Sequence, residues 1–302
     1  MSKITPHLWF DTQAKEAAEF YSEVFPESQV TNVTTLRDTP SGDCDVVAFK
    51  VWNHDFMAIS AGPLFEINPS ISFIVNFDPD SLPDAAEVLD RVWAQLTDGG
   101  NELMPLGEYP FSKRYGWVAD RYGVSWQLIL SDTEGDPRPT IVPSLMFTGD
   151  VCGKAAEAKE FYLSVFDDSE PGQSVPYPEG SDPDEPGTTM FADFRLADGW
   201  FAAMDSARVH DFGFNEAVSL MIGCSDQDEI DYFWERLSAV PEAEQCGWLK
   251  DRFGVSWQVT PAALDEMMAR GTPEQIDRVT QAFLPMKKFD VAALRAAYEG
   301  QG

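Results

Sequence analysis

Few side chains in this chain suit acid–base or metal chemistry, and the histidines come first among them. The sequence contains three, His7, His54 and His210. His7 lies in an apolar opening segment, whereas His54 lies in a predicted turn, where we expect it to be exposed, and His210 lies in a predicted loop without an evident partner. Histidine is the side chain most often used for proton transfer and metal binding near neutral pH. A chemical role for histidine therefore depends on His7.

The cysteines and glycines exclude several common kinds of site. Cys44, Cys152, Cys224 and Cys246 form no CxxC pair, so we interpret them as free thiols and not as a disulfide framework or a zinc site. The chain lacks the G-x-S-x-G elbow, the P-loop and the zinc-protease motif. Gly99-Gly100 follows a predicted helix, where a C-terminal cap explains it, so we find no glycine-rich turn for S-adenosylmethionine and exclude methyl transfer.

A further group of polar residues occurs twice, because the sequence repeats itself. Residues 114–130 (RYGWVADRYGVSWQLIL) and 245–261 (QCGWLKDRFGVSWQVTP) share Gly-Trp, Asp-Arg and Gly-Val-Ser-Trp-Gln at the same spacing. Residues 17–25 and 158–166 form a second matching pair. Internal repetition determines architecture. It also provides a control, since a residue needed for chemistry in one copy can be compared with its counterpart.

The repeats divide the 302 residues into two domains of ordinary size. We predict a first domain at residues 1–131, a polar linker with Gly and Pro at 132–139, a second domain at 140–260 and a C-terminal tail at 261–302. The tail is absent from the first repeat. Apolar residues at helical spacing predict one or two docked helices in it, with Ile276, Val279, Phe283 and Met286 before Pro285 interrupts, and Val291, Leu294 and Tyr298 after it.

Each domain is expected to contain the order strand, helix, three strands twice over. In the first domain the predicted strands are 4–10, 29–37, 45–52, 55–60, 70–77, 113–119 and 124–130, and the predicted helices follow the first strand and span 83–96 with Ser81 as the cap. The second domain opens with a strand at 141–147. It has ten fewer residues between Trp234 and Trp248 than the first has between Trp93 and Trp117, so one strand or loop is shortened. Residues 167–188 are predicted to form a mobile surface loop.

The formal net charge of −30 restricts the partners of the protein. It argues against nucleic acid and against anionic membrane surfaces, because both would repel an acidic chain. No apolar run approaches the roughly 20 residues that span a bilayer, and the first residues do not form a signal peptide. We therefore expect a cytoplasmic protein whose acidity favours solubility.

Three features resemble the PhnB-like branch of the vicinal oxygen chelate superfamily, which includes glyoxalases, extradiol dioxygenases and bleomycin-resistance proteins. The opening residues 6–10 (PHLWF) precede a helix with 18–21 (AEFY), residues 120–127 (DRYGVSWQ) resemble the D-x-F-G-V-x-W motif of the branch, and residues 278–294 are similar to its C-terminal segment. The branch carries the label 3-demethylubiquinone-9 3-methyltransferase, which we consider misleading because the chain lacks a methyltransferase motif.

The resemblance implies an α+β fold of two tandem glyoxalase-like domains, each built from paired βαβββ modules that form a cupped sheet with helices outside. A ligand would bind in the cup. Alternation along the strands then directs His7 and Trp9 into the cup, and Leu8, Phe10 and Trp126 toward the helices. The candidate ligand-binding residues are His7, Trp9, Phe49, Ser70, Ser125 and Gln127, with Ser144, Met146, Phe194, Ser256 and Gln258 in the second copy.

The resemblance also raises the question of a metal. Active members of the superfamily hold a divalent ion, such as Mn, Fe, Ni, Co or Zn, with His or Glu from four strands, and His7 and Gln127 match two of these positions in the first domain. The positions near Phe49 and Ser70 offer no ligand, and Ser144 stands in place of His7 in the second copy. We therefore interpret His7 as a pocket or core histidine satisfied by hydrogen bonds. A carboxylate that reaches the cup from a strand with a different register would make a metal site feasible again, and the candidates are Asp45, Asp55 and Glu66.

Three functions are compatible with these residues. The first is the binding of a small molecule in an aromatic-lined cup without a complete metal site. The alternative is a metal-dependent lyase, isomerase or oxygenase that acts on a substrate with vicinal oxygens, by analogy with the superfamily. The third is a scaffold role for the second copy. The modules can pair within a repeat or by exchange between repeats, which leaves open a pseudo-dimeric monomer or a homodimer.

Overall fold

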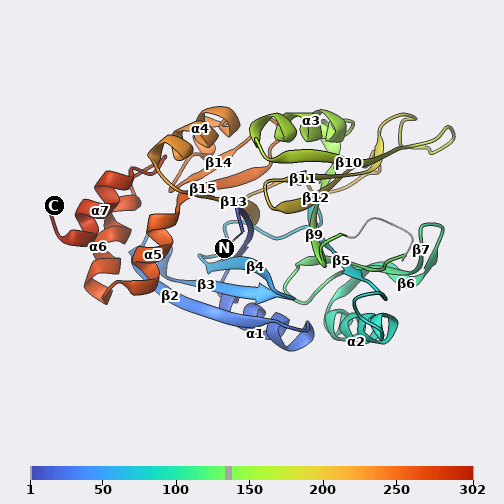
Figure 1. Ribbon diagram of the computed structural model, residues 1–302, viewed down its shortest axis with the longest axis horizontal. Helices are drawn as coiled ribbons and strands as arrows, with labels where there is room; N and C mark the ends of the chain where they lie inside the picture. Colours follow the sequence, from blue (N-terminus) through green and yellow to red (C-terminus); the bar gives the residue numbers. More distant parts are fainter. Residues whose placement is uncertain (1, 133–137, 302) are drawn as a thin grey trace. The chain divides into compact units, whose positions relative to one another are not determined.

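The computed structural model describes residues 2–132 and 138–301 and confirms the α+β class (Figure 1). The strands form one sheet of seven and one of eight strands. The chain divides into two compact units, each of which contains one sheet. Most of the predicted linker, residues 133–137, lies outside the described residues. None of the helices in the described ranges is long and apolar enough to cross a membrane.

Unit 1 combines Met1–Ser22 and Glu27–Glu66 with Phe214–Gly302. Its sheet has the strand order β14-β15-β13-β1-β4-β3-β2. The strands are β1 (Ile4–Phe10), β2 (Gln29–Thr39), β3 (Gly42–Val51), β4 (His54–Ser60), β13 (Val218–Cys224), β14 (Trp248–Lys250) and β15 (Ser256–Pro261). The helices are α1 (Ala14–Val24), α4 (Gln227–Leu237), the 3-10 turn η2 (Pro241–Ala243), and the tail helices α5 (Ala262–Arg270), α6 (Pro273–Phe283) and α7 (Val291–Glu299).

Unit 2 consists of Glu23–Pro26 and Ile67–Gly213. Its sheet has the strand order β10-β11-β12-β9-β5-β8-β7-β6. The strands are β5 (Ile71–Phe77), β6 (Asn101–Tyr109), β7 (Ser112–Ala119), β8 (Ser125–Leu130), β9 (Ile141–Phe147), β10 (Ser169–Pro176), β11 (Thr189–Leu196) and β12 (Gly199–Asp205). The helices are α2 (Ala85–Thr97), the 3-10 turn η1 (Gly149–Val151) and α3 (Ala155–Val165).

The modules pair by exchange between the repeats, which answers the question that the sequence left open. In unit 1, β1 of the first repeat pairs antiparallel with β13 of the second, in the register Ile4↔Ile222 to Leu8↔Val218. In unit 2, β5 and β9 pair in the same antiparallel way, from Ile71↔Leu145 to Val75↔Ile141. The compact units are therefore not the sequence repeats, because each unit takes one module from each repeat.

The repeated Asp-Arg-x-Gly-Val-Ser-Trp segment is a structural turn. One carboxylate oxygen of Asp120 accepts hydrogen bonds from the backbone N–H groups of Tyr122 and Val124, and the other accepts one from Trp126 Nε1 at 2.9 Å. Asp251 makes the same three contacts with Phe253, Val255 and Trp257. Gly123 has a φ of 84°, a left-handed conformation that glycine adopts without a steric penalty. The segment therefore anchors a fully buried tryptophan under the helices of each unit.

Several local predictions differ from the structure. The turn before β4 is formed by Trp52 and Asn53, both with positive φ, so His54 begins the strand and is half-buried instead of exposed. The helix α2 begins after Asp84, and Ser81 is not its cap, although its predicted apolar face is buried. Residues 169–176 of the predicted loop at 167–188 form the strand β10, which pairs with β11. The shortened segment of the second repeat is the turn η2, which stands where the first repeat has β6.

The tail belongs to unit 1, and its described residues form three helices, where one or two were predicted. Helix α5 directly follows β15 and contacts both β15 and β2, and α6 also contacts β2 (Figure 1). Because β15 and β2 lie near opposite ends of the sheet order, the tail connects the two sides of this sheet. A capping box between Thr272 and Gln275 starts α6, and Pro273 occupies its first turn.

Candidate ligand-binding site

The strand β1 presents His7 and Trp9 on one face of the unit 1 sheet, as alternation predicts. Both rings contact Trp248 edge-on, with centroid distances of 5.4 Å from His7 and 6.3 Å from Trp9. Trp9 also meets Phe65 at 5.1 Å, and its Nε1 donates to the backbone oxygen of Gly62 at 2.8 Å. These contacts form an aromatic cluster of His7, Trp9, Phe65 and Trp248.

The cluster lies on the concave face of the sheet. Trp248 is on β14 and His7 is on β1, which are three strands apart in the sheet order. On a flat sheet three strand spacings would separate them by about 14 Å. Their rings nevertheless lie 5.4 Å apart, so the sheet curves and the side chains of this face converge. A concave surface with aromatic side chains is the usual form of a small-molecule site.

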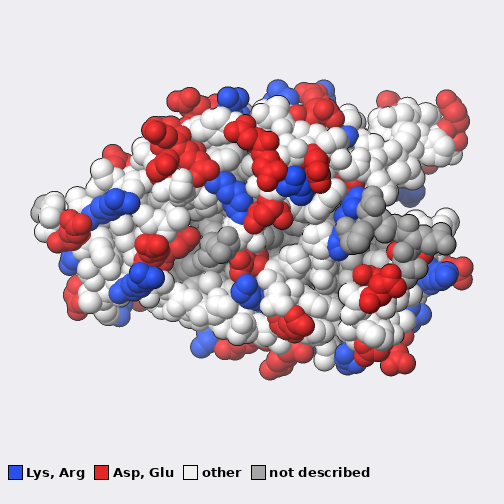
Figure 2. All heavy atoms as spheres, viewed as in Figure 1, with Lys and Arg blue, Asp and Glu red and all other residues white. Residues whose placement is uncertain are grey.

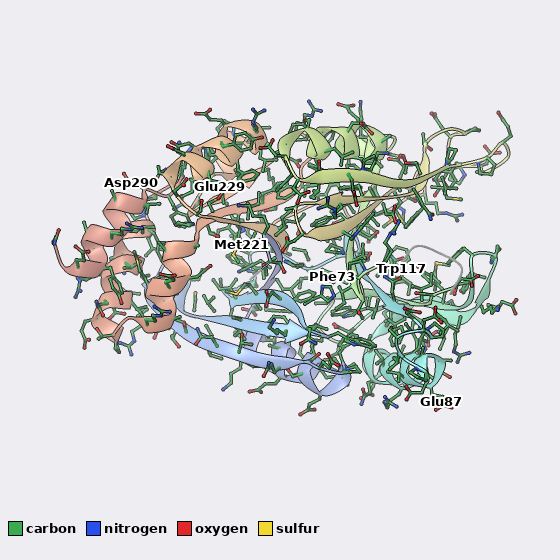
Figure 3. All side chains as sticks on the ribbon, viewed as in Figure 1. Phe73, Glu87, Trp117, Met221, Glu229 and Asp290 are labelled. Atoms are coloured by element: carbon green, nitrogen blue, oxygen red, sulfur yellow. The ribbon has the colours of Figure 1, made fainter. Side chains whose placement is uncertain are left out.

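The equivalent face of unit 2 is closed by its own hydrogen bonds. Tyr115 Oη donates to Gln127 Oε1 at 2.7 Å, and Gln127 Nε2 donates to Ser72 Oγ at 2.7 Å. Trp117, which is labelled in Figure 3, donates from Nε1 to Ser125 Oγ at 2.7 Å. The polar groups of these strands thus satisfy one another without a ligand.

Unit 1 carries the same residue types in the same register except for Cys246 in place of Tyr115, and two of these three bonds are missing. Trp248 and Gln258 are Cα partners, as Trp117 and Gln127 are in unit 2. Gln258 Nε2 donates to Ser219 Oγ at 2.8 Å, which preserves one contact. Trp248 Nε1 and Ser256 Oγ, however, are both buried without a hydrogen-bond partner. One tryptophan–serine pair is therefore bonded and its counterpart is not.

The neighbours of Trp248 explain the difference. Its ring packs against the rings of His7 and Trp9, whereas the counterparts of these two residues in unit 2 are Ser144 and Met146, which have no ring. The aromatic contacts thus hold Trp248 in an orientation in which it does not bond to Ser256. Two more atoms of the same unit, His7 Nδ1 and Thr5 Oγ1, are buried without a partner, as is Ser144 Oγ in unit 2.

His7 differs from its predicted state in one respect. It is 3% exposed, as expected for a pocket or core histidine, but its Nδ1 makes no hydrogen bond. Burial lowers the pKa of His7 to about 3, so the imidazole is neutral at physiological pH. A buried, neutral and unpaired imidazole nitrogen can accept or donate one hydrogen bond to a ligand, depending on its tautomer.

The two candidate metal ligands do not share a sheet. His7 belongs to unit 1 and Gln127 to unit 2, where Gln127 bonds to Tyr115 and Ser72. The amide that shares a sheet with His7 is that of Gln258. The two residues would share a sheet only if the modules of one repeat paired with each other, and in the structure they do not.

The residues around His7 do not fit a divalent metal. Its Cα partners are Met57 and Ser219, and its ring neighbour is Trp248. A thioether, a hydroxyl and an indole are poor ligands for the ions that prefer imidazole and carboxylate. Among residues 2–132 and 138–301, no group of three or more His, Cys, Asp or Glu side chains is arranged to hold a metal ion.

Two of the carboxylates considered as additional ligands have other partners, and the third lies outside the sheet. Asp45 accepts a hydrogen bond from Thr35 Oγ1 at 2.7 Å, and Asp55 forms an ion pair with Lys50 at 3.2 Å. Glu66 lies outside the strands, between β4 and β5.

The remaining predicted site residues divide between the units. Ser256 and Gln258 lie in unit 1, and Ser70, Ser125, Ser144 and Met146 lie in unit 2. Phe49 and Phe194 were expected near the cup but lie on the opposite face, since Phe49 stacks on Tyr21 of α1 and Phe194 on Tyr162 of α3. Sequence reasoning did not select Thr5, Phe65, Ser219 or Trp248. Trp248 could have been found, because it belongs to the repeated Gly-Trp pair.

The other nucleophiles and histidines have structural surroundings. All four cysteines are free, and burial raises the pKa of Cys224 to about 12, which keeps its thiol protonated. His210 Nε2 lies 2.8 Å from Ser206 Oγ, so it has the partner that the sequence did not reveal. Burial lowers the pKa of His54.

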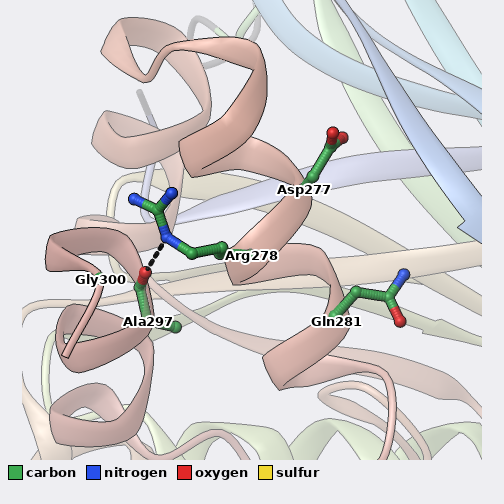
Figure 4. Close-up of a pocket in the computed structure, with 5 residues that line it drawn as sticks. All are labelled: Asp277, Arg278, Gln281, Ala297 and Gly300. Atoms are coloured by element: carbon green, nitrogen blue, oxygen red, sulfur yellow. Dashed lines mark hydrogen bonds between the residues drawn. The ribbon is translucent and has the colours of Figure 1, made fainter. Parts of the chain in front are cut away.

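A second hollow lies in the tail, between α6 and α7 (Figure 4). It has a volume of about 380 Å³ and is lined by Asp277, Arg278, Gln281, Ala297 and Gly300. Arg278 donates to the backbone oxygens of Ala297 and Tyr298, each at 2.9 Å, and so satisfies the carboxyl end of α7. These bonds give Arg278 a structural role in joining the two helices.

Comparison with known proteins identifies the family. A family model described as 3-demethylubiquinone-9 3-methyltransferase matches residues 2–129 and, a second time, residues 139–260. The chain belongs to this family. The match includes both repeats and confirms the resemblance seen in the sequence. None of the curated proteins compared with the chain matches it.

Solved structures show that the fold of the chain resembles that of glyoxalase I. A putative 3-demethylubiquinone-9 3-methyltransferase, a PhnB protein from Bacillus cereus, is 34% identical over 43% of this chain and 100% of its own, with a TM-score of 0.38. Glyoxalase I from Zea mays is 12% identical over 87% of this chain and 96% of its own, with a TM-score of 0.54. A putative dioxygenase from Bacillus subtilis is 11% identical over 87% and 89%, with a TM-score of 0.51. The last two likenesses concern the fold alone.

Proposed function

We propose that the protein binds a small molecule at the concave face of unit 1, one per chain. The observation that carries the proposal is the difference between two equivalent pairs. Trp117 and Ser125 are hydrogen-bonded in unit 2, whereas Trp248 and Ser256 are buried and unpaired in unit 1. An unpaired buried polar group costs about 1–3 kcal/mol. A ligand that bonds to these atoms would remove that cost, whereas the equivalent face of unit 2 has one such unpaired atom, Ser144 Oγ.

The arrangement around the site supports binding without a metal. Strands β1, β14 and β15 contribute four unpaired polar atoms, from Thr5, His7, Trp248 and Ser256. The aromatic cluster provides apolar surface beside them. Methyl transfer has no support from Gly99-Gly100, because Gly99 directly follows α2 with a φ of 77°, as glycine does where a helix ends.

A thermal-shift screen of small molecules tests the proposal, with Trp248→Phe and Trp117→Phe as matched variants. We expect ligands to raise the Tm of the wild type and of Trp117→Phe, and not that of Trp248→Phe. At a hundredfold excess over Kd, a ligand stabilises the folded state by about 2.7 kcal/mol. Calorimetry should give one ligand per chain.

Two outcomes would contradict the proposal. Ligands that stabilise both variants equally would place binding elsewhere. Metal analysis of the protein purified without chelator gives the second test. About one transition metal per chain that is lost in His7→Ala would favour the metal-dependent enzyme instead.

A further inference from the structure

The four buried atoms of the unit 1 site that lack a hydrogen-bond partner restrict the chemistry of the ligand. Trp248 Nε1 is an obligate donor, whereas the hydroxyls of Ser256 and Thr5 can donate or accept. His7 Nδ1 adapts through its tautomer. A ligand that satisfies the tryptophan must therefore carry a hydrogen-bond acceptor, and the other three atoms accept either partner.

Charge is already balanced on the strands that carry this site. Lys250, two residues after Trp248, pairs with Glu216 at 2.9 Å. Asp55, two residues before the Cα partner of His7 on β4, pairs with Lys50 at 3.2 Å. Among the described residues, no ion pair or hydrogen bond joins a charged side chain to the four unpaired atoms. A charged ligand would be desolvated here without a counter-charge, which is unfavourable.

The aromatic cluster favours a flat molecule. Trp9 is held by its bond to Gly62, and its ring makes angles of 80° with Phe65 and 76° with Trp248. Edge-on contacts of this kind leave ring faces for offset stacking with another planar group. The strands of Ser256 and His7 lie two positions apart in the sheet order, which corresponds to about 10 Å on a flat sheet and to a shorter distance on this curved one. This distance is spanned by one or two fused rings.

We propose that the ligand of unit 1 is an uncharged aromatic molecule of one or two rings with an acceptor oxygen or nitrogen that bonds to Trp248 Nε1 and Ser256 Oγ. This inference rests on the proposed function and specifies the ligand class. The ligand would supply to Trp248 the acceptor that Ser125 supplies to Trp117 in unit 2.

Three probes with one ring system and different charges test this class. They are naphthalene-2-carboxamide, 2-naphthoate and 2-naphthylmethylamine, titrated into the full chain by calorimetry. We expect the carboxamide to bind at least tenfold more tightly than the anion or the cation. Its Kd should be unchanged between pH 5.5 and 8, since His7 stays neutral over this range. In ¹⁵N-labelled protein the carboxamide should shift the indole N–H signal that is absent from Trp248→Phe.

Matched variants assign the contact. Ser256→Ala should weaken carboxamide binding at least tenfold, and Ser125→Ala should leave it unchanged. Ser256→Ala removes one oxygen atom, so it remains informative if Trp248→Phe folds poorly. Tighter binding of the anion or the cation, equal affinity in the two serine variants, or binding of none of the probes would overturn the ligand class. If none of the three probes binds, water and not an aromatic ligand would satisfy the four unpaired atoms. The proposed function has a separate test: it fails if ligands from the thermal-shift screen stabilise Trp248→Phe and Trp117→Phe equally.

Discussion

At the scale of single residues, the same side chain has different roles in the two repeats. Tryptophan and serine occur at equivalent positions of β7 and β8 and of β14 and β15, but they bond to each other only in unit 2. The cause lies outside the motif, in the replacement of Ser144 and Met146 by His7 and Trp9. A repeated motif therefore does not imply two repeated sites.

The most repeated part of the sequence serves stability instead. We expect Asp120→Asn and Asp251→Asn each to lower the free energy of unfolding by about 2–4 kcal/mol, because an amide N–H₂ would face donors that a carboxylate now accepts from. Urea denaturation measures the loss. Asp167→Asn, an exposed substitution, is the control. If either motif variant were as stable as the control, the carboxylate would not organise the turn.

Alternation along β1 was enough to predict that His7 and Trp9 share a face. The missing hydrogen bond of Trp248 Nε1 could not be predicted. It depends on the orientation of the indole ring, which is set by contacts with His7 and Trp9 from the other repeat. The sequence could not show that His7 and Gln127 lie in different sheets for a related reason, because this depends on how the modules of the two repeats pair. Phe49 was predicted on the wrong face of β3. The prediction placed this strand out of register by one position, which reverses the face of every side chain.

At the scale of elements, the strands and helices with strong periodicity were predicted closely, and the exceptions have local causes. The strand β10 was missed because its sequence, SEPGQSVP, contains two Pro and one Gly and has little β-propensity. Helix α5 was missed because it follows β15 without a break at Pro261. Its stability comes from packing against β15, β2 and the other tail helices, which local sequence does not reveal.

Helix α5 carries a carboxylate whose titration tests this packing. Burial raises the pKa of Asp265 from 3.8 to about 6. The folded state therefore binds this proton more tightly than the unfolded state, so the free energy of unfolding falls as the pH rises from about 4 to above 6. Asp265→Asn should stabilise the protein by about 1–2 kcal/mol at pH 7.5 and have little effect at pH 4, a value reduced for its partial exposure.

Thermal unfolding at both pH values measures the effect. Glu266→Gln, at the exposed neighbouring position, should change the Tm little at either pH. If Asp265→Asn raised the Tm equally at pH 4 and pH 7.5, the carboxyl group of Asp265 would not be buried in the folded protein.

At the scale of the whole molecule, the formal net charge of −30 is distributed over the surface. Acidic side chains lie over α3 and α4 on the face seen in Figure 2. The sequence predicted two tandem repeats of paired modules correctly but could not determine how the modules pair, because β1 can present the same apolar residues to β5 or to β13. The structure pairs it with β13, so neither repeat contains a complete sheet.

This exchange predicts how the separated repeats behave. Residues 1–131 alone contain β1 and β5 without their partners β13 and β9, which leaves two long apolar edges unpaired. Because β5 resembles β13 in position, we expect this fragment to form a homodimer in which β1 of one copy pairs with β5 of the other. Co-expression with residues 140–302 should instead give a one-to-one complex. Size-exclusion chromatography with light scattering measures both masses. A folded monomer of residues 1–131 would mean that the two modules of one repeat can close on each other, and exchange would then be a property of the fused chain rather than a requirement of the fold.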